Sequence, residues 1–114
     1  MLAGHIVEYP STDTLSEATA GGVEMDAVTY PACRDLVDTW QVVSEEDIRW
    51  GMKYIWDSHQ ERVEGAAGMC VAAVRNIITD NNNIDLNNKN VCVLLCGGNI
   101  DVETHYKAVC VQVQ

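Results

Sequence analysis

The sequence predicts an α/β fold, in the form of a small, partial three-layer sandwich with a short, mainly parallel sheet. Residues 91–95 are an unbroken, valine-rich apolar run, which is typical of a strand buried on both faces. Gly97 and Gly98 follow at once, and Asn99 and Asp101 then suit a tight turn and a helix start. The order strand, helix, helix, strand, glycine turn is half of a doubly wound arrangement, whose ligands bind beyond the carboxyl ends of the strands.

The first third of the chain predicts short elements separated by glycines and prolines. In chain order they are an edge strand or extended arm over residues 6–9 that ends at Pro10, a short helix from Thr14 or Ser16 towards Gly21, a helix from Pro31 to Val37, and a short strand over residues 40–43.

Two longer helices are expected in the middle of the chain. Ser44 is a good N-cap, and the three acids that follow it favour the positive end of a helix dipole. Apolar positions then recur at helical spacing, and the expected stripe is Ile48, Met52, Ile55 and His59. We interpret Met52, Trp50 and Trp56 as core or interface packing.

The second long helix opens at Gly65 and is apolar on most sides, so it should be buried against a sheet. A polar, asparagine-rich loop over residues 79–90 leads from it into the strand that begins at Val91. The tail over residues 108–114 alternates partly between apolar and polar side chains, which predicts a further edge strand.

Composition limits the possible functions. We expect the 114 residues to form one α/β domain, 1–114, and the net charge of −10 disfavours nucleic acids and anionic membranes as partners. No apolar run approaches the roughly 20 residues of a membrane span, and the N-terminus lacks a secretory signal pattern. The five cysteines are odd in number and lack zinc-site spacing, so we expect a cytoplasmic protein without a metal site.

The residues around Cys96 have alternative interpretations. Gly97-Gly98-Asn99 before a helix start is either an anion site made of backbone N–H groups or a plain tight turn, and we favour the turn. Cys96 lacks a neighbouring cation in the sequence, so a buried cysteine is the preferred interpretation over a reactive thiol. Glu64 begins a helix, where a carboxylate is stabilising in any case.

Five motifs occur in an order that resembles the C-terminal part of the large domain of threonine/serine dehydratases and serine racemases. These are fold-type II enzymes that depend on pyridoxal phosphate (PLP). The resemblance covers roughly residues 4–103 and leaves a divergent tail over 104–114. The motifs are Thr14-Leu-Ser-Glu-Ala-Thr-Ala-Gly-Gly22, Arg34-Asp-Leu-Val-Asp38, Val42-Val-Ser-Glu-Glu-Asp-Ile48, Val63-Glu-Gly-Ala-Ala-Gly68 and Leu95-Cys-Gly-Gly-Asn-Ile100.

The resemblance implies roles for individual residues. Cys96 stands at the family's Ser or Cys position, which faces the pyridine nitrogen of PLP. Gly97 and the neighbouring Gly98 would let the backbone approach the ring, and Glu64 would lie near the cofactor. Residues 17–18, Glu17 and Ala18, match an Asp-Gly pair that borders the substrate site.

The same resemblance implies that this segment lacks the groups that carry out the family's reaction. The family's Schiff-base lysine, its phosphate-binding glycine loop and its metal-binding carboxylates lie in a part upstream of this segment. None of the chain's own lysines, Lys53, Lys89 and Lys107, stands in the family's lysine context. Ala18 also replaces a glycine close to the cofactor. We therefore expect no catalytic residue in this chain and no PLP binding by the chain alone.

Three functions remain from the sequence. The preferred one is a truncated dehydratase-like domain without catalysis of its own. The alternatives are a subunit of a split enzyme completed by a second chain, and a small-ligand or regulatory binding domain. Because an isolated half-domain leaves apolar faces uncovered, we also expect a homodimer whose seam involves residues 39–43 or 109–113.

Overall fold

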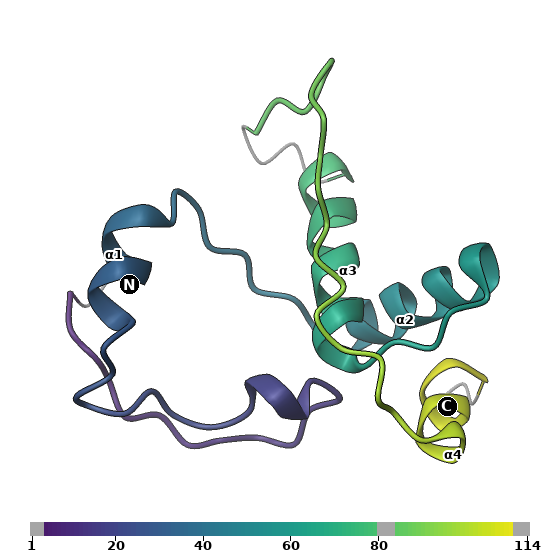
Figure 1. The fold of residues 1–114 in the computed structure, drawn as a ribbon, viewed down its shortest axis with the longest axis horizontal. Coiled ribbons are helices and arrows are strands. Elements are labelled where there is room, and N and C mark those ends of the chain that lie inside the picture. The colour runs from purple at the N-terminus through teal and green to yellow at the C-terminus, as the bar shows by residue number, and fades with distance from the viewer. Residues whose placement is uncertain (1–3, 80–83, 111–114) are drawn as a thin grey trace.

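The computed structural model describes residues 4–79 and 84–110, and within them the regular structure is helical. In chain order the elements are a 3₁₀ turn η1 (Glu17–Thr19) and helices α1 (Tyr30–Leu36), α2 (Glu45–His59), α3 (Gly65–Thr79) and α4 (Val102–Cys110). Figure 1 shows α2, α3 and α4 gathered together, with α1 set apart from α2 and α3 at the end of a long loop.

The predicted α/β sandwich with a parallel sheet is wrong, because no strand occurs among the described residues. Residues 84–100 instead return alongside α3 as an irregular segment (Figure 1). An apolar run becomes a strand only where a second strand satisfies its backbone N–H and C=O groups. The described part of the chain offers none, so residues 91–95 form no ladder, and Val91, Leu94 and Leu95 stay exposed.

The three other predicted strands are also not found where the structure describes them. Residues 6–9 and 40–43 are irregular, and residues 102–110 of the tail are helix α4. Residues 111–114 lie outside the described residues. Asp101 explains why the tail is helical: its side chain accepts a hydrogen bond from the Thr104 backbone N–H at 2.9 Å, which caps α4 as the predicted helix start requires.

Helix α2 is confirmed with its predicted cap. The Ser44 hydroxyl accepts a hydrogen bond from the Asp47 backbone N–H at 3.2 Å, and Ile48, Met52 and Ile55 are buried as one stripe. His59, the last residue of the predicted stripe, is exposed. The helix ends at Gln60, whose φ of 57° is the left-handed conformation that closes many helices.

Helix α3 is confirmed as well, but it packs against α2 and not against the predicted sheet, and two glycines set its distance from α2. A Cβ on Gly51 of α2 would lie 2.1 Å from the carbonyl oxygen of Gly68 on α3. The two backbones therefore touch directly, and Met52 fills the space beside Gly68 with none of its surface exposed. Helix α4 completes this core, because His105 lies edge-on to Trp56 with ring centroids 5.5 Å apart.

The N-terminal elements are short. Helix α1 matches the predicted helix at Pro31, and the helix predicted from Thr14 or Ser16 is reduced to the single turn η1. Among the described residues no helix is long and apolar enough to cross a membrane.

Candidate functional site

A polar pocket of about 580 Å³ lies where three separate segments meet. The segment before η1 forms one wall, the start of α3 forms the floor, and the turn into α4 forms the opposite wall. The lining residues are Thr14, Leu15, Glu17, Ala18, Glu64, Gly65, Ala66, Asn99, Ile100, Asp101 and Thr104.

Glu64 holds the turn after residue 96 by two hydrogen bonds. Its backbone N–H donates to the Gly97 carbonyl at 3.0 Å, and its Oε1 accepts from the Asn99 backbone N–H at 2.7 Å. Gly97 is needed here because a Cβ at this position would lie 2.6 Å from Glu64 Oε2. At Gly98 a Cβ would lie 3.3 Å from the Arg62 carbonyl oxygen, which leaves it tight but tolerable. The glycine pair thus fits closely against Glu64 and its neighbours.

The wall formed by the segment before η1 is held by Glu45 at the start of α2. Its carboxylate accepts hydrogen bonds from the Thr14 hydroxyl and, at 2.9 Å, from the Leu15 backbone N–H. Gly65 closes the base of this wall, since a Cβ there would lie 2.1 Å from the Leu15 carbonyl oxygen. Ser16 is buried, so the chain turns at this point and leaves Glu17 exposed at the pocket.

The structure brings most of the predicted site residues together. Glu17, Ala18 and Glu64 line the same pocket, and Gly97 packs on the Glu64 carboxylate with Gly98 beside it. The predicted Cys96 lies outside this lining and is exposed. Its thiol interacts with Cys70 on α3, where burial first and Cys96 second raise the pKa of the Cys70 thiol.

The pocket is acidic, and this limits the groups that it can hold. Glu17, Glu64 and Asp101 are its charged residues, and its lining contains no lysine, arginine or histidine. The Thr104 backbone N–H holds the pKa of Asp101 below its usual range, so this carboxylate stays ionised at neutral pH. A phosphate group would therefore meet carboxylates and no cation.

The lysines lie elsewhere. Lys53 pairs with Asp57 at 2.8 Å on α2, and Lys107 pairs with Glu103 at 2.7 Å on α4. Lys89 belongs to the loop before residue 91, and none of the three lines the pocket. The residues present in this chain thus do not fit the complete PLP cofactor, which needs a lysine for its aldehyde and donors for its phosphate. Within residues 4–79 and 84–110 no cluster of His, Cys, Asp and Glu could hold a metal ion.

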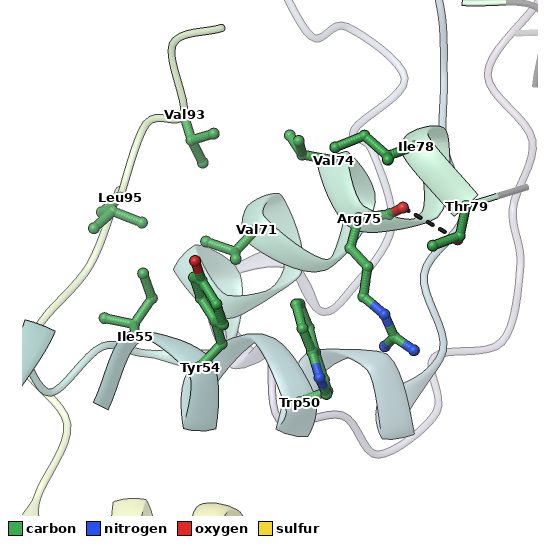
Figure 2. A pocket seen from close by; sticks show the side chains of 10 residues that line it. All are labelled: Trp50, Tyr54, Ile55, Val71, Val74, Arg75, Ile78, Thr79, Val93 and Leu95. Atoms are coloured by element: carbon green, nitrogen blue, oxygen red, sulfur yellow. Dashed lines mark hydrogen bonds between the residues drawn. The ribbon is translucent and has the colours of Figure 1, made fainter. Parts of the chain in front are cut away.

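A second, apolar groove of about 450 Å³ opens between α2, α3 and residues 93–95 (Figure 2). Trp50 and Tyr54 stack with ring centroids 5.3 Å apart, and the Arg75 guanidinium lies 4.4 Å from the Trp50 ring centroid. The sequence indicates core or interface packing for Trp50, but it does not predict that this side chain lines an open groove.

Several lining residues of the polar pocket were not predicted. The sequence predicts a turn at Asn99 and a helix start at Asp101, and it predicts no site for Asp101 or Thr104. One sequence pattern could have indicated Asp101 and Thr104. They form a helix cap, Asp101-x-x-Thr104, directly after the glycine turn, and a capping side chain lies at the end of the helix that the turn enters.

Comparison with known proteins finds relatives named as threonine ammonia-lyase, serine racemase and threonine dehydratase. No family model matches the chain. The L-threonine ammonia-lyase of Geobacter sulfurreducens is 41% identical over 102 residues, which is 89% of this chain and 24% of that protein. Human serine racemase is 31% identical over 94 residues, 82% of this chain and 26% of the racemase. A putative threonine dehydratase of Sinorhizobium fredii is 29% identical over 94% of this chain and 31% of that protein. The chain thus spans between about a quarter and a third of the length of these curated relatives.

Proposed function

Because this chain belongs to the fold-type II, PLP-dependent family of threonine dehydratases and serine racemases, we propose that it is a truncated domain of that family that has no catalysis of its own. The proposal concerns the 114-residue chain acting alone. In this interpretation the chain keeps one wall of the family's site and lacks the groups that carry the covalent step.

The observation that supports this proposal is the charge of the polar pocket. Glu17, Glu64 and Asp101 line it without a cation, and all three lysines of the chain lie outside it. A phosphate placed there would be repelled, and no amine is within the lining to attack an aldehyde. The pocket can therefore hold only a neutral or positively charged part of a ligand.

The remaining wall has proposed roles that follow from the family. Gly97, Gly98 and Glu64 would border the cofactor ring, and Glu17 with Ala18 would border the substrate. Their sharing of one pocket or of direct contacts with Glu64 supports this assignment. For Cys96, the role opposite the ring nitrogen would require the thiol to turn away from Cys70.

The test is a direct assay of the purified chain. After mixing with PLP we expect no visible aldimine absorbance, and after addition of L-serine or L-threonine we expect no release of 2-oxo acid. The Geobacter sulfurreducens enzyme, assayed in parallel, is the positive control. Turnover that survives replacement of Lys53, Lys89 and Lys107 by arginine would point to a contaminating enzyme, whereas turnover lost in that variant would overturn the proposal.

A second candidate function is a small-ligand binding domain, which the acidity of the pocket favours. Carboxylates around a cavity of about 580 Å³ suit a compact ammonium compound such as an amino acid. A thermal-shift screen of amino acids and pyridine compounds would detect it, and Glu17→Gln should weaken any stabilising compound because Glu17 is exposed at the pocket. A screen without one stabilising compound would rule this function out.

We also propose that the chain is cytoplasmic, because its five cysteines are odd in number and do not suggest a disulfide framework. All five cysteines are free thiols, although two of them, Cys70 and Cys96, lie beside each other.

A further inference from the structure

Cys70 of α3 lies at the boundary between the polar pocket and the apolar groove. Ala66, one helical turn earlier, lines the polar pocket, and Val74, one turn later, lines the groove (Figure 2). Residues four apart share a face of a helix, so this row of side chains runs from one cavity to the other through Cys70. The Cys70 thiol is partly buried and donates a hydrogen bond to the Ala66 carbonyl at 3.4 Å.

Cys96 lies on the segment that crosses the same boundary. Its neighbour Leu95 lines the groove, and its other neighbour, Gly97, packs on the Glu64 carboxylate at the polar pocket. The hydrogen bond from the Glu64 backbone N–H to the Gly97 carbonyl fixes this segment against the start of α3, one residue from Cys96. The Cys96 thiol is exposed and interacts with Cys70. The fold thus brings together two thiols that are far apart in the sequence.

We infer that Cys70 and Cys96 form an oxidative modification site, at which hydrogen peroxide makes a reversible disulfide between α3 and the segment 84–100. The Cys96 thiolate first attacks one peroxide oxygen and becomes a sulfenic acid, while the O–O bond breaks and hydroxide leaves as water after taking up a proton. The Cys70 sulfur then attacks the Cys96 sulfur, and the S–O bond breaks as the S–S bond forms. The second oxygen also leaves as water, so two thiols are oxidised and one peroxide is reduced.

The surroundings of the two thiols assign their roles in this sequence of steps. Cys96 is exposed, so peroxide reaches it from solvent. Burial and, in second place, Cys96 raise the pKa of the Cys70 thiol, so Cys70 stays protonated at neutral pH and reacts slowly with free peroxide. Cys70 needs no access to solvent for the second step, because the sulfur that it attacks lies beside it. Cys96 is therefore the thiol that is oxidised first, and Cys70 is the thiol that closes the disulfide.

The disulfide has a consequence for both cavities. It closes the stretch 70–96 and fastens α3 to a segment that has no strand pairing in the described part of the chain. A cross-link restricts the unfolded chain, so oxidation should raise the melting temperature by about 5 °C. It also withdraws the Cys96 thiol from the wall that the proposed function assigns to the cofactor ring. Only this last point rests on the proposed function.

The test is mild oxidation of the full chain with hydrogen peroxide at low protein concentration, followed by thiol blocking, trypsin digestion without reductant and mass spectrometry. Trypsin releases Cys70 within residues 63–75, and Cys96 within residues 90–107 together with Cys92. The Cys92→Ser variant is therefore oxidised in parallel, so that a link between these two peptides identifies Cys96. We expect this link to exceed every other cysteine link by at least about tenfold, and dithiothreitol to reverse it.

Serine variants separate the two steps. In Cys70→Ser, peroxide should leave Cys96 as a sulfenic acid, which dimedone traps. In the unmodified chain the same label should be at least about tenfold weaker, because Cys70 consumes the sulfenic acid. Cys33→Ser is the matched control, since Cys33 is also a partly buried helical cysteine but lies on α1. This variant should keep both the link and the rise of about 5 °C in melting temperature.

Three results would overturn the inference. If the link between residues 63–75 and 90–107 is absent from oxidised Cys92→Ser, the two thiols do not join. A link found only in covalent dimers connects two chains, and not α3 with its own segment. If the folded chain gives the same mixture of links as the chain unfolded in urea, the fold does not select this pair. None of these outcomes depends on PLP binding or turnover, so each leaves the proposed function standing.

Discussion

Residues 4–44 and residues 45–110 differ in what they do with their apolar side chains. The buried hydrophobic residues all belong to the second region, where α2, α3 and α4 pack together. In the first region Ser16 is the one buried residue, whereas Val28 is 92% and Leu36 is 78% exposed. Helix α1 contacts no other helix among the described residues. The local sequence, with Pro31 in the first turn, is therefore enough for α1 to form as a helix. Helices α2 and α3 gain their stability from burial against each other.

The largest test of this difference compares two methionines. Met52→Ala removes a side chain with no exposed surface from the centre of the α2–α3 contact, so we expect it to lower the free energy of unfolding by about 3 kcal/mol. Met25→Ala is the control from the other region, because Met25 is 66% exposed, and its effect should stay within about 0.5 kcal/mol. Urea denaturation followed by circular dichroism measures both, and equal losses would contradict the comparison.

Two glycines give the next test. A Cβ at Gly51 would lie 2.1 Å from the Gly68 carbonyl oxygen, so Gly51→Ala should force α2 and α3 apart. We expect a net loss of about 2 kcal/mol, because the better helix propensity of alanine offsets part of the overpacking. At Gly22 nothing lies within 4 Å, and Gly22→Ala should leave the unfolding midpoint in urea unchanged. A stabilised Gly51→Ala variant would show that the two helices are not in contact.

Helix caps give a smaller effect. Ser44 accepts a hydrogen bond from Asp47 at the start of α2, whereas the Thr29 side chain makes no such bond at the start of α1. Ser44→Ala should therefore cost about 1 kcal/mol, and Thr29→Ala should cost almost nothing. Thermal unfolding of the two variants measures the difference. A larger loss for Thr29→Ala would mean that α1 carries more of the stability than its exposure implies.

The smallest expected effect is a pH dependence confined to the second region. Burial and, to a lesser degree, Arg62 lower the pKa of His105 below its ordinary value of 6.5. As the pH falls through that value, the unfolded chain takes up the proton before the folded chain does. The contribution of neutral His105 to stability is thus complete above about pH 7 and declines as the pH falls below 6.5. Urea midpoints measured across this range should fall for the native chain.

His105→Phe is the control for this prediction. Phenylalanine keeps an aromatic ring against Trp56 and cannot be protonated, so its urea midpoint should fall less over the same range. An equal decline in both proteins would assign the pH dependence to a different group.

The sequence predicted the helices better than the fold class. Helices are specified by nearby residues, and the Ser44 cap, the stripe from Ile48 to Ile55 and Pro31 marked them correctly. A strand depends on a partner that can be anywhere in the chain. Residues 91–95 have the composition of a buried strand, but the described residues supply no neighbour to pair with.

The candidate site shows the same limit. The glycine pair Gly97-Gly98 and the helix-initiating Glu64 were each visible as local features. That the Glu64 carboxylate receives the Asn99 N–H, 35 residues later in the chain, follows from packing and could not be read from spacing. Cys96 shows the opposite case, since its place in the motif was clear but its thiol lies beside Cys70.

The two hydrogen bonds between Glu64 and the turn at residues 97–99 have a consequence for protein engineering. They join Glu64, directly before α3, to Gly97 at 3.0 Å and to Asn99 at 2.7 Å, so the stretch 64–99 begins and ends at neighbouring positions. A stretch of this kind can be exchanged between related proteins at two neighbouring attachment points, provided that the host keeps the α2 surface on which α3 packs. The stretch 64–99 is thus the natural unit for building chimaeras between this chain and its longer relatives.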